Sequence, residues 1–209
     1  MIYLSDDYVD KYCNTLSYLI GRSYYEKNTV DYIERTIAYS LPIDELEKSN
    51  VTLLAFSSME KIYSEMFNSS GSDYVLDIYD MFGWIGYAYM HLFLHLEITF
   101  EALFSVISIK DMMNLYNLYH EMDFVQLVDH TKEVMKYSLL DVFMKKKDIS
   151  NTVLAKKTKI SVSTINALRY GKREIEKLEV KKALAIANAL GIKIQSLLSN
   201  IQLEKSMPI

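Results

Sequence analysis

Four side chains that can contact the edges of DNA bases lie within five positions of one another: Val162, Ser163, Thr164 and Asn166. Ser and Thr hydroxyls hydrogen-bond to several bases, and Asn can pair with adenine through two hydrogen bonds. The methyl groups of Val and Thr can contact a thymine methyl. The pattern therefore predicts a segment that reads the major groove, with a preference for A·T-rich half-sites.

Two short helices joined by a tight turn are expected to position these side chains. Apolar residues within 149–173 recur at spacings that place them on a shared face of two crossing helices, while Ser163, Thr164 and Asn166 are left pointing outward. Ser161 is predicted to cap the second helix by accepting a hydrogen bond from the backbone N–H of Ser163 or Thr164. The predicted buried positions are Leu154, Ala155, Ile160, Ile165 and Leu168.

The charge is divided sharply between two parts of the chain, although the net charge is only −4. Residues 1–133 carry 8 Lys and Arg against 21 Asp and Glu, and residues 134–209 carry 15 against 6. The net charges are therefore −13 and +9, and only the second part attracts a polyanion, with counterion release supplying much of the affinity. The basic residues around the predicted helix pair are Lys145, Lys146, Lys147, Lys156, Lys157, Lys159, Arg169, Lys172 and Arg173.

Contacts to DNA phosphates are predicted at both ends of the helix pair. Asn151 begins the first helix, Arg169 ends the second, and Tyr170, Lys172 and Arg173 follow it. Such contacts fix the register of a protein on the duplex without reading its sequence. The alternative interpretation is that these residues, like Ser163 and Thr164, form an ordinary solvated helix surface.

Residues 150–198 resemble the Cro and phage-repressor (xenobiotic-response-element) helix-turn-helix family. The resemblance rests on segment 149–173 and on the closing AlaLeuAlaIleAlaAsnAlaLeuGlyIleLysIleGlnSerLeuLeu at 183–198, and it covers roughly residues 136–199. It implies a λ-repressor-like bundle of about five helices whose third helix lies in the major groove. Two positions depart from the family, because Lys159 replaces the usual turn glycine and Thr158 replaces the preceding apolar residue. A lysine at positive φ costs about 1 kcal/mol relative to glycine.

The composition predicts an all-α protein, since half of the residues are apolar and only 6 Gly and 2 Pro interrupt the helical spacing. We expect an acidic helical domain at residues 1–135, for interaction or dimerisation, followed by the five-helix DNA-binding domain at residues 136–209. No Pro or Gly marks the boundary, so the helix that begins near Phe124 is expected to continue into the DNA-binding domain. The predicted N-terminal helices are 6–20, 28–39, 44–48, 52–67, 74–97, 100–106, 109–119 and 124–136, with a linker at 68–72.

Other classes of function find less support in the sequence. The apolar run 81–96 is shorter than the roughly 20 residues of a membrane span and is flanked by acidic residues, so a buried helix is expected. His91 and His95 have a spacing that can hold zinc, but a third ligand would have to come from His120 or Glu101, and semi-buried histidines are the favoured interpretation. The lone Cys13 suits a protein core in a reducing cytoplasm. We therefore expect no enzyme activity, no metal and no cofactor.

These observations predict a cytoplasmic transcriptional regulator that binds double-stranded DNA sequence-specifically, as a homodimer on an inverted repeat, and represses by occupancy. An alternative is an antitoxin, whose N-terminal domain neutralises a toxin and whose C-terminal domain represses their shared promoter. A third is a ligand-responsive regulator whose N-terminal bundle encloses a small molecule. The 17 tyrosines fit an interaction surface and a Tyr-rich core equally well.

Overall fold

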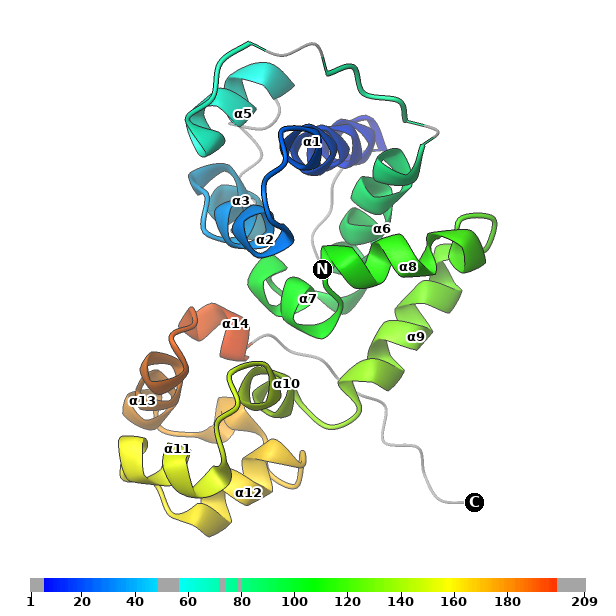
Figure 1. Cartoon of the computed structure of the whole chain (residues 1–209). Coiled ribbons are helices and arrows are strands. Elements are labelled where there is room, and N and C mark those ends of the chain that lie inside the picture. Colours follow the sequence, from blue (N-terminus) through cyan, green and yellow to red (C-terminus); the bar gives the residue numbers. More distant parts are fainter. Residues whose placement is uncertain (1–5, 49–56, 72–73, 79, 199–209) are drawn as a thin grey trace.

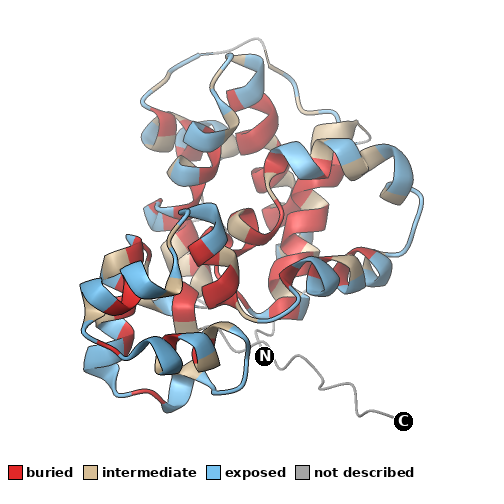
Figure 2. Ribbon diagram, turned by 60° about the horizontal axis from the view of Figure 1, so that its bottom comes forward, coloured by how far each residue is buried: buried red, intermediate tan, exposed pale blue. Residues whose placement is uncertain are grey.

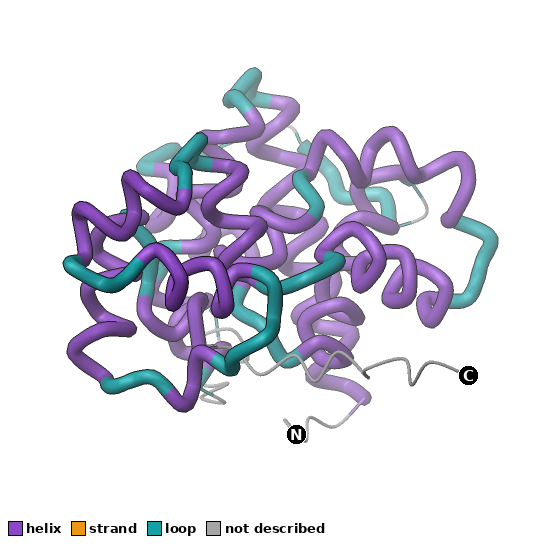
Figure 3. Tube along the Cα trace, turned by 90° about the horizontal axis from the view of Figure 1, so that it is seen from below, coloured by secondary structure: helices purple, strands orange, loops and turns teal. Residues whose placement is uncertain are grey.

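The structure, a computed structural model, describes residues 6–48, 57–71, 74–78 and 80–198, and in these residues every regular element is helical (Figures 1 and 3). The all-α fold class is thus confirmed. The N-terminal part contains α1 (Asp6–Tyr25), α2 (Val30–Ala38), α3 (Leu41–Glu47), α5 (Met59–Phe67), α6 (Met81–Leu96), α7 (Phe100–Val106), α8 (Ile109–Tyr119) and α9 (Phe124–Met135). The C-terminal part contains α10 (Leu139–Lys146), α11 (Asn151–Thr158), α12 (Val162–Arg169), the 3₁₀ turn η1 (Ile175–Lys177), α13 (Val180–Leu190) and α14 (Ile194–Leu198).

Side-chain caps, more than prolines and glycines, determine where these helices begin. At each capped start a Ser, Thr or Asp side chain accepts a hydrogen bond from a backbone N–H of the first turn, which stabilises a helix by about 1 kcal/mol. A sequence with few helix breakers therefore still divides into short helices. The capping residues are Thr29, Ser40, Ser58, Asp80, Thr99, Ser108, Asp123, Ser138, Ser150 and Ser161.

The predicted helices 100–106 and 109–119 have the observed bounds, whereas the helix predicted over 74–97 begins too early. It starts only at Met81, because the Asp80 carboxylate caps it through Gly83 N at 2.8 Å. The preceding chain also crosses Gly83 so closely that a Cβ there would lie 2.2 Å from the carbonyl oxygen of Ile78. The first residues of the helix predicted at 52–67 lie outside the described residues.

The prediction that the helix starting at Phe124 continues into the DNA-binding domain is wrong. α9 ends at Met135, and Lys136 adopts φ 57°, which a continuing helix does not allow. Ser138 then starts α10 by accepting a hydrogen bond from Asp141 N, and its hydroxyl donates to the carbonyl oxygen of Arg169 at 2.7 Å. A non-glycine turn and a capping serine thus separate the two helices without Pro or Gly.

The apolar run 81–96 forms the buried helix that was expected, with most of its residues inside the protein (Figure 2). α6 packs closely along α1, where Gly86 leaves room for Ser17, whose hydroxyl donates to the carbonyl oxygen of Gly83 at 2.9 Å. Cys13 lies in the same buried layer, as predicted, and burial raises the pKa of its thiol to about 12. No helix in the described part of the chain is long and apolar enough to cross a membrane.

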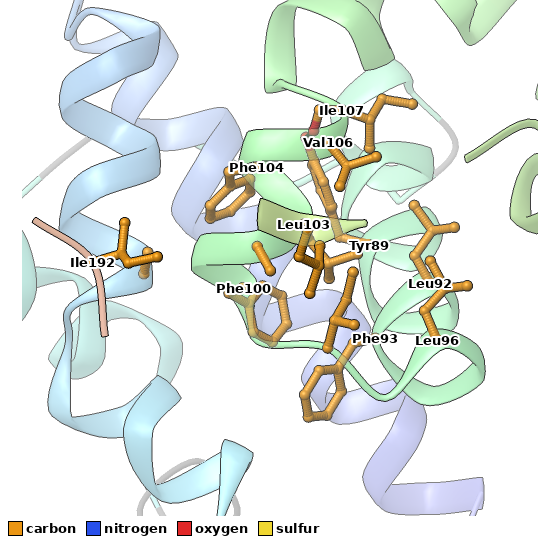
Figure 4. Close-up of a cluster of buried hydrophobic side chains, with 14 of the residues drawn as sticks. Tyr89, Leu92, Phe93, Leu96, Phe100, Leu103, Phe104, Val106, Ile107 and Ile192 are labelled. Carbon is orange, nitrogen blue, oxygen red and sulfur yellow. Dashed lines mark hydrogen bonds between the residues drawn. The ribbon is translucent and has the colours of Figure 1, made fainter. Parts of the chain in front are cut away.

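α7 is the element on which the N-terminal and C-terminal parts meet. It packs against α2, α6 and α9 of the N-terminal part and against α10 and α14 of the C-terminal part. Figure 4 shows its side chains Phe100, Leu103 and Phe104 between α6 on one side and Ile192 on the other. One cluster of buried apolar residues therefore runs through both parts. The division into two domains between residues 135 and 136 stays a prediction.

Buried charges reinforce this junction. The Glu101 carboxylate on α7 accepts hydrogen bonds from Lys193 N at 2.9 Å and from the Ser196 hydroxyl at 2.6 Å. The Lys193 ammonium group reaches back into the N-terminal part, where it donates to the carbonyl oxygen of Ala38 and pairs with Asp44, with Glu47 3.7 Å away. Because each carboxylate has a donor from across the junction, the charges stabilise the docked arrangement of the two parts.

Replacing Lys193 with Met should test this arrangement. The substitution keeps the apolar stem but leaves Asp44 and Glu47 without their cation, so the free energy of unfolding should fall by about 3 kcal/mol. Urea denaturation measures the change. The matched control is Lys182→Met, which removes an exposed pair with Glu179 and should change stability by less than about 1 kcal/mol. Equal effects of the two substitutions would contradict the proposed role of Lys193.

Candidate nucleic-acid interface

α11 and α12 form the predicted helix pair, and the turn between them has the expected geometry. Lys159 ends α11 in the left-handed region at φ 58°, the conformation for which the family usually provides glycine. Ser161 then caps α12 by accepting a hydrogen bond from Thr164 N at 3.2 Å, as predicted. The short turn aims the first residues of α12 away from the rest of the domain (Figure 1).

The shared apolar face of the helix pair is also confirmed. All five residues predicted to be buried between the helices are buried, and Ile165 and Leu154 are completely so. α11 additionally packs against α13, and α12 packs against α10. α12, the candidate recognition helix, is thus held along one side, and its opposite side is exposed.

The four candidate base-reading residues share the first turns of α12 but differ in exposure. Val162 is 45% exposed, Ser163 and Asn166 are exposed, and Thr164 is half-buried. The Ser161 hydroxyl lies 3.0 Å from that of Ser163 and 2.8 Å from that of Thr164. Ser163 and Thr164 therefore each have a hydrogen-bond partner within the cap.

A chain of polar contacts that the sequence did not predict links the recognition helix to the rest of the domain. The Asn151 amide donates to Asn166 Oδ1 at 2.9 Å, and Asn151 Oδ1 accepts from Arg169 Nη1 at 2.9 Å. Arg169 Nε in turn pairs with Asp141 Oδ1 at 2.7 Å. A base-reading candidate, two phosphate-binding candidates and a residue of α10 thus form one connected network.

Asp141 anchors this network, and sequence reasoning missed it. It is 1% exposed and pairs with Lys145 at 2.7 Å as well as with Arg169. Burial on its own raises the pKa of a carboxyl group, but the hydrogen bonds from Lys145 and Arg169 outweigh it and hold the pKa of Asp141 below its ordinary value. The signal in the sequence was the spacing of Ser138 and Asp141, a start pattern for a helix that faces the recognition helix.

The remaining phosphate-binding candidates surround the end of α12. Tyr170 is exposed and stacks edge-on against Tyr137, with ring centroids 5.2 Å apart. Lys172 and Arg173 are exposed and form no ion pair with a described residue. Gly171, between Tyr170 and Lys172, makes a turn with φ 66°. Arg169 differs from the others, because its guanidinium group is already paired inside the domain.

The histidines and acidic residues form no competing metal site in the part of the chain that the structure describes, where no group of three or more metal-ligating residues occurs. His95 Nδ1 lies 2.8 Å from the carbonyl oxygen of His91, and His91 stacks on Phe124 with ring centroids 4.2 Å apart. Partial burial, followed by the nearby His95, lowers the pKa of His91. His91 is therefore half-buried, as the sequence favoured, whereas His95 is exposed and bonded to the backbone of His91.

Comparison with known proteins agrees with this geometry. Residues 139–202 match the family model of the Cro/C1-type HTH DNA-binding domain, as the sequence resemblance predicted. No curated protein and no solved structure matches the chain. Residues 139–202 thus have the features of a Cro/C1-type HTH DNA-binding domain, which supports a DNA-binding regulator.

Replacing Asp141 with Asn should show how much the buried pair stabilises the protein. The substitution removes the charge that Arg169 and Lys145 neutralise, and the free energy of unfolding at pH 7 should fall by about 2 kcal/mol. Because the pKa of Asp141 is lower in the folded than in the unfolded protein, this contribution is present above pH ~4 and lost as the pH falls through the folded-state pKa. Denaturation of both proteins at several pH values measures it.

The matched control is Asp129→Asn, which changes an exposed carboxylate on α9 and should leave stability nearly unchanged at every pH. The role of the charge would be contradicted if the free energies of unfolding of the Asp141→Asn variant and the unaltered protein differed as much at low pH as at pH 7.

Proposed function

We propose that this protein binds duplex DNA sequence-specifically through α12 and regulates transcription by occupying its operator. One observation carries the proposal: α12 is buried along one side and exposes Val162, Ser163 and Asn166 on the other. A helix held in this way, with small polar side chains on its first turns, fits the major groove of B-DNA.

Within this proposal, phosphate binding relies on the cations that form no ion pair with a described residue. Lys145, Lys146 and Arg169 all pair with carboxylates of the protein, so they have less charge to offer to DNA. The exposed cations without an ion pair to a described residue lie on α11 and beyond α12, at the two ends of the recognition unit. They are Lys156, Lys157, Lys159, Lys172 and Arg173.

To read a base, Asn166 Oδ1 must accept a hydrogen bond from the DNA in addition to the one that it accepts from Asn151. Asn166 Oδ1 already accepts from the Asn151 amide, while its own amide group donates to no described residue. A two-bond contact with adenine uses both groups, and a carbonyl oxygen has two lone pairs. Asn151 therefore holds the Asn166 side chain in place, and it is a positioning residue in addition to its predicted phosphate contact.

Binding as a homodimer, which an inverted-repeat operator requires, is supported by α13. Val180 and Leu184 lie one turn apart on this helix and are 75% and 45% exposed. Two apolar side chains at this spacing suit a self-complementary contact between two copies. Duplex DNA as the ligand also supports the predicted cytoplasmic location.

The antitoxin alternative and this proposal share the DNA-binding step and differ in the partner of the N-terminal part. The genes adjacent to that of this protein distinguish them. An antitoxin should restore growth when co-expressed with a neighbouring toxic gene, whereas a regulator without a toxin partner should not.

Alanine substitutions on α12 should separate base reading from phosphate binding. An operator is first selected from randomised duplex DNA with the full-length protein. Ser163→Ala and Asn166→Ala remove groove-facing groups without changing the charge, so specific affinity should fall by about 1–3 kcal/mol per lost base contact while the salt dependence barely moves. Arg173→Ala should weaken binding to every sequence and reduce the magnitude of the salt slope by roughly one unit.

The matched control is Asn188→Ala, an exposed asparagine on α13, which should leave the ratio of specific to nonspecific affinity unchanged. Circular dichroism verifies that each variant retains its helices. If the double variant Ser163→Ala, Asn166→Ala keeps that ratio intact, α12 does not read the bases.

A further inference from the structure

A cleft of about 1080 Å³ lies at the junction of the N-terminal and C-terminal parts. The N-terminal side of its wall comes from α2, α3, α5 and α7, and the C-terminal side comes from α10 and the turn between α13 and α14. Small-molecule sites occupy roughly 300–1,000 Å³ and favour interfaces between domains, so this cleft has the size and position of a ligand site.

The cleft has an apolar lining that would suit the body of such a ligand. Ile62 and Met66 contribute from α5, Phe104 from α7, Phe143 from α10, and Ile192 from the turn before α14. All but Met66 are buried, and Met66 packs against the same core. Figure 4 labels Phe104 on α7 and Ile192 from the C-terminal part, one residue from each side of this junction.

The buried carboxylates of the cleft already have partners. Glu34 Oε1 accepts from Ile109 N at 2.7 Å and its Oε2 lies 3.6 Å from the Lys146 ammonium group. Glu101 accepts hydrogen bonds from Lys193 N, Tyr39 and Ser196. The oxygens of both carboxylates are thus engaged by groups of the protein, and the exposed carboxylates in the lining are Asp31 and Glu65.

The cations of the cleft, by contrast, include two without a partner. Arg35 on α2 and Lys147 at the end of α10 both line the cleft, are exposed, and form no ion pair with a described residue. Asp31, one turn before Arg35, also lines the cleft and is exposed, but it forms no ion pair with Arg35. The two cations come from opposite sides of the junction, so an anionic group between them would contact both parts of the protein.

We propose that this cleft binds an amphipathic small-molecule anion, with its apolar body on Phe104, Phe143 and Ile192 and its anionic group between Arg35 and Lys147. Such a ligand bridges the N-terminal part and the DNA-binding domain and stabilises their docked arrangement. It binds whether or not the protein recognises an operator. If the proposed function holds, it also makes operator affinity depend on the ligand.

Decanoate and decyltrimethylammonium, which share an alkyl chain but carry opposite charges, are suitable probes for the full-length protein. Isothermal titration calorimetry should show saturable binding of decanoate and none of the ammonium compound. Arg35→Gln and Lys147→Gln should each weaken decanoate binding about tenfold, because each removes one charge-assisted contact. The temperature of unfolding should rise with decanoate concentration in the unaltered protein and rise less in both variants.

Two further variants complete the experiment. Lys110→Gln removes an exposed cation on α8 that does not line the cleft, and it should bind decanoate as the unaltered protein does. Thr36→Phe places a ring in the cleft and should abolish binding. The proposal is overturned if decanoate does not bind saturably, if both probes bind equally, or if Arg35→Gln and Lys147→Gln bind decanoate unchanged. If the full-length protein binds decanoate as expected but binds no operator, the proposed function is wrong and the ligand proposal stands.

Discussion

The Glu101 carboxylate is the group on which the relative position of the two parts depends. A carboxylate buried this deeply is tolerated only when hydrogen-bond donors surround it, and two of its donors, Lys193 N and the Ser196 hydroxyl, belong to the DNA-binding domain. Moving that domain away from α7 would leave Glu101 without them. The N-terminal part therefore does more than add acidic bulk, since it fixes the platform on which the recognition helix is presented.

α10 connects this platform to the recognition helix through charged contacts in two directions. Toward the N-terminal part, Lys146 donates to the carbonyl oxygen of Phe104 at 2.9 Å and pairs with Glu34. Toward α12, Asp141 pairs with Arg169. Arg169 in turn donates to Asn151, which donates to Asn166. A shift of α10 would have to disturb both sets of contacts. The same helix also lines the junction cleft, so a ligand bound there would contact the element that supports α12.

Features that depend on neighbouring residues in the sequence were predicted well. The buried positions Ile165 and Leu168 followed from helical spacing, and the cap at Ser161 followed from residue type. Features that depend on residues far apart in the sequence were not predicted. Glu101 and Lys193 are 92 positions apart, and nothing in either local sequence indicates that they meet. The pairing of Asn151 with Asn166 was missed for a related reason, since it depends on how two helices cross. The break between α9 and α10 was missed because an ordinary lysine, Lys136, adopts a positive φ there.

The pairing of charges inside the protein also explains how a chain of net negative charge can present a DNA-binding face. Glu34 is buried and Glu47 is half-buried at the junction, where the ammonium groups of Lys146 and Lys193 lie 3.6 Å and 3.7 Å from them. Burial raises the pKa of both groups, and the backbone hydrogen bonds and the nearby ammonium groups oppose this rise only in part. These two carboxylates thus have cations beside them, while the cations on α11 and beyond α12 form no ion pair with a described residue. At physiological salt the field of more distant carboxylates is screened within about 8 Å, so the local excess of cations governs the attraction to a duplex.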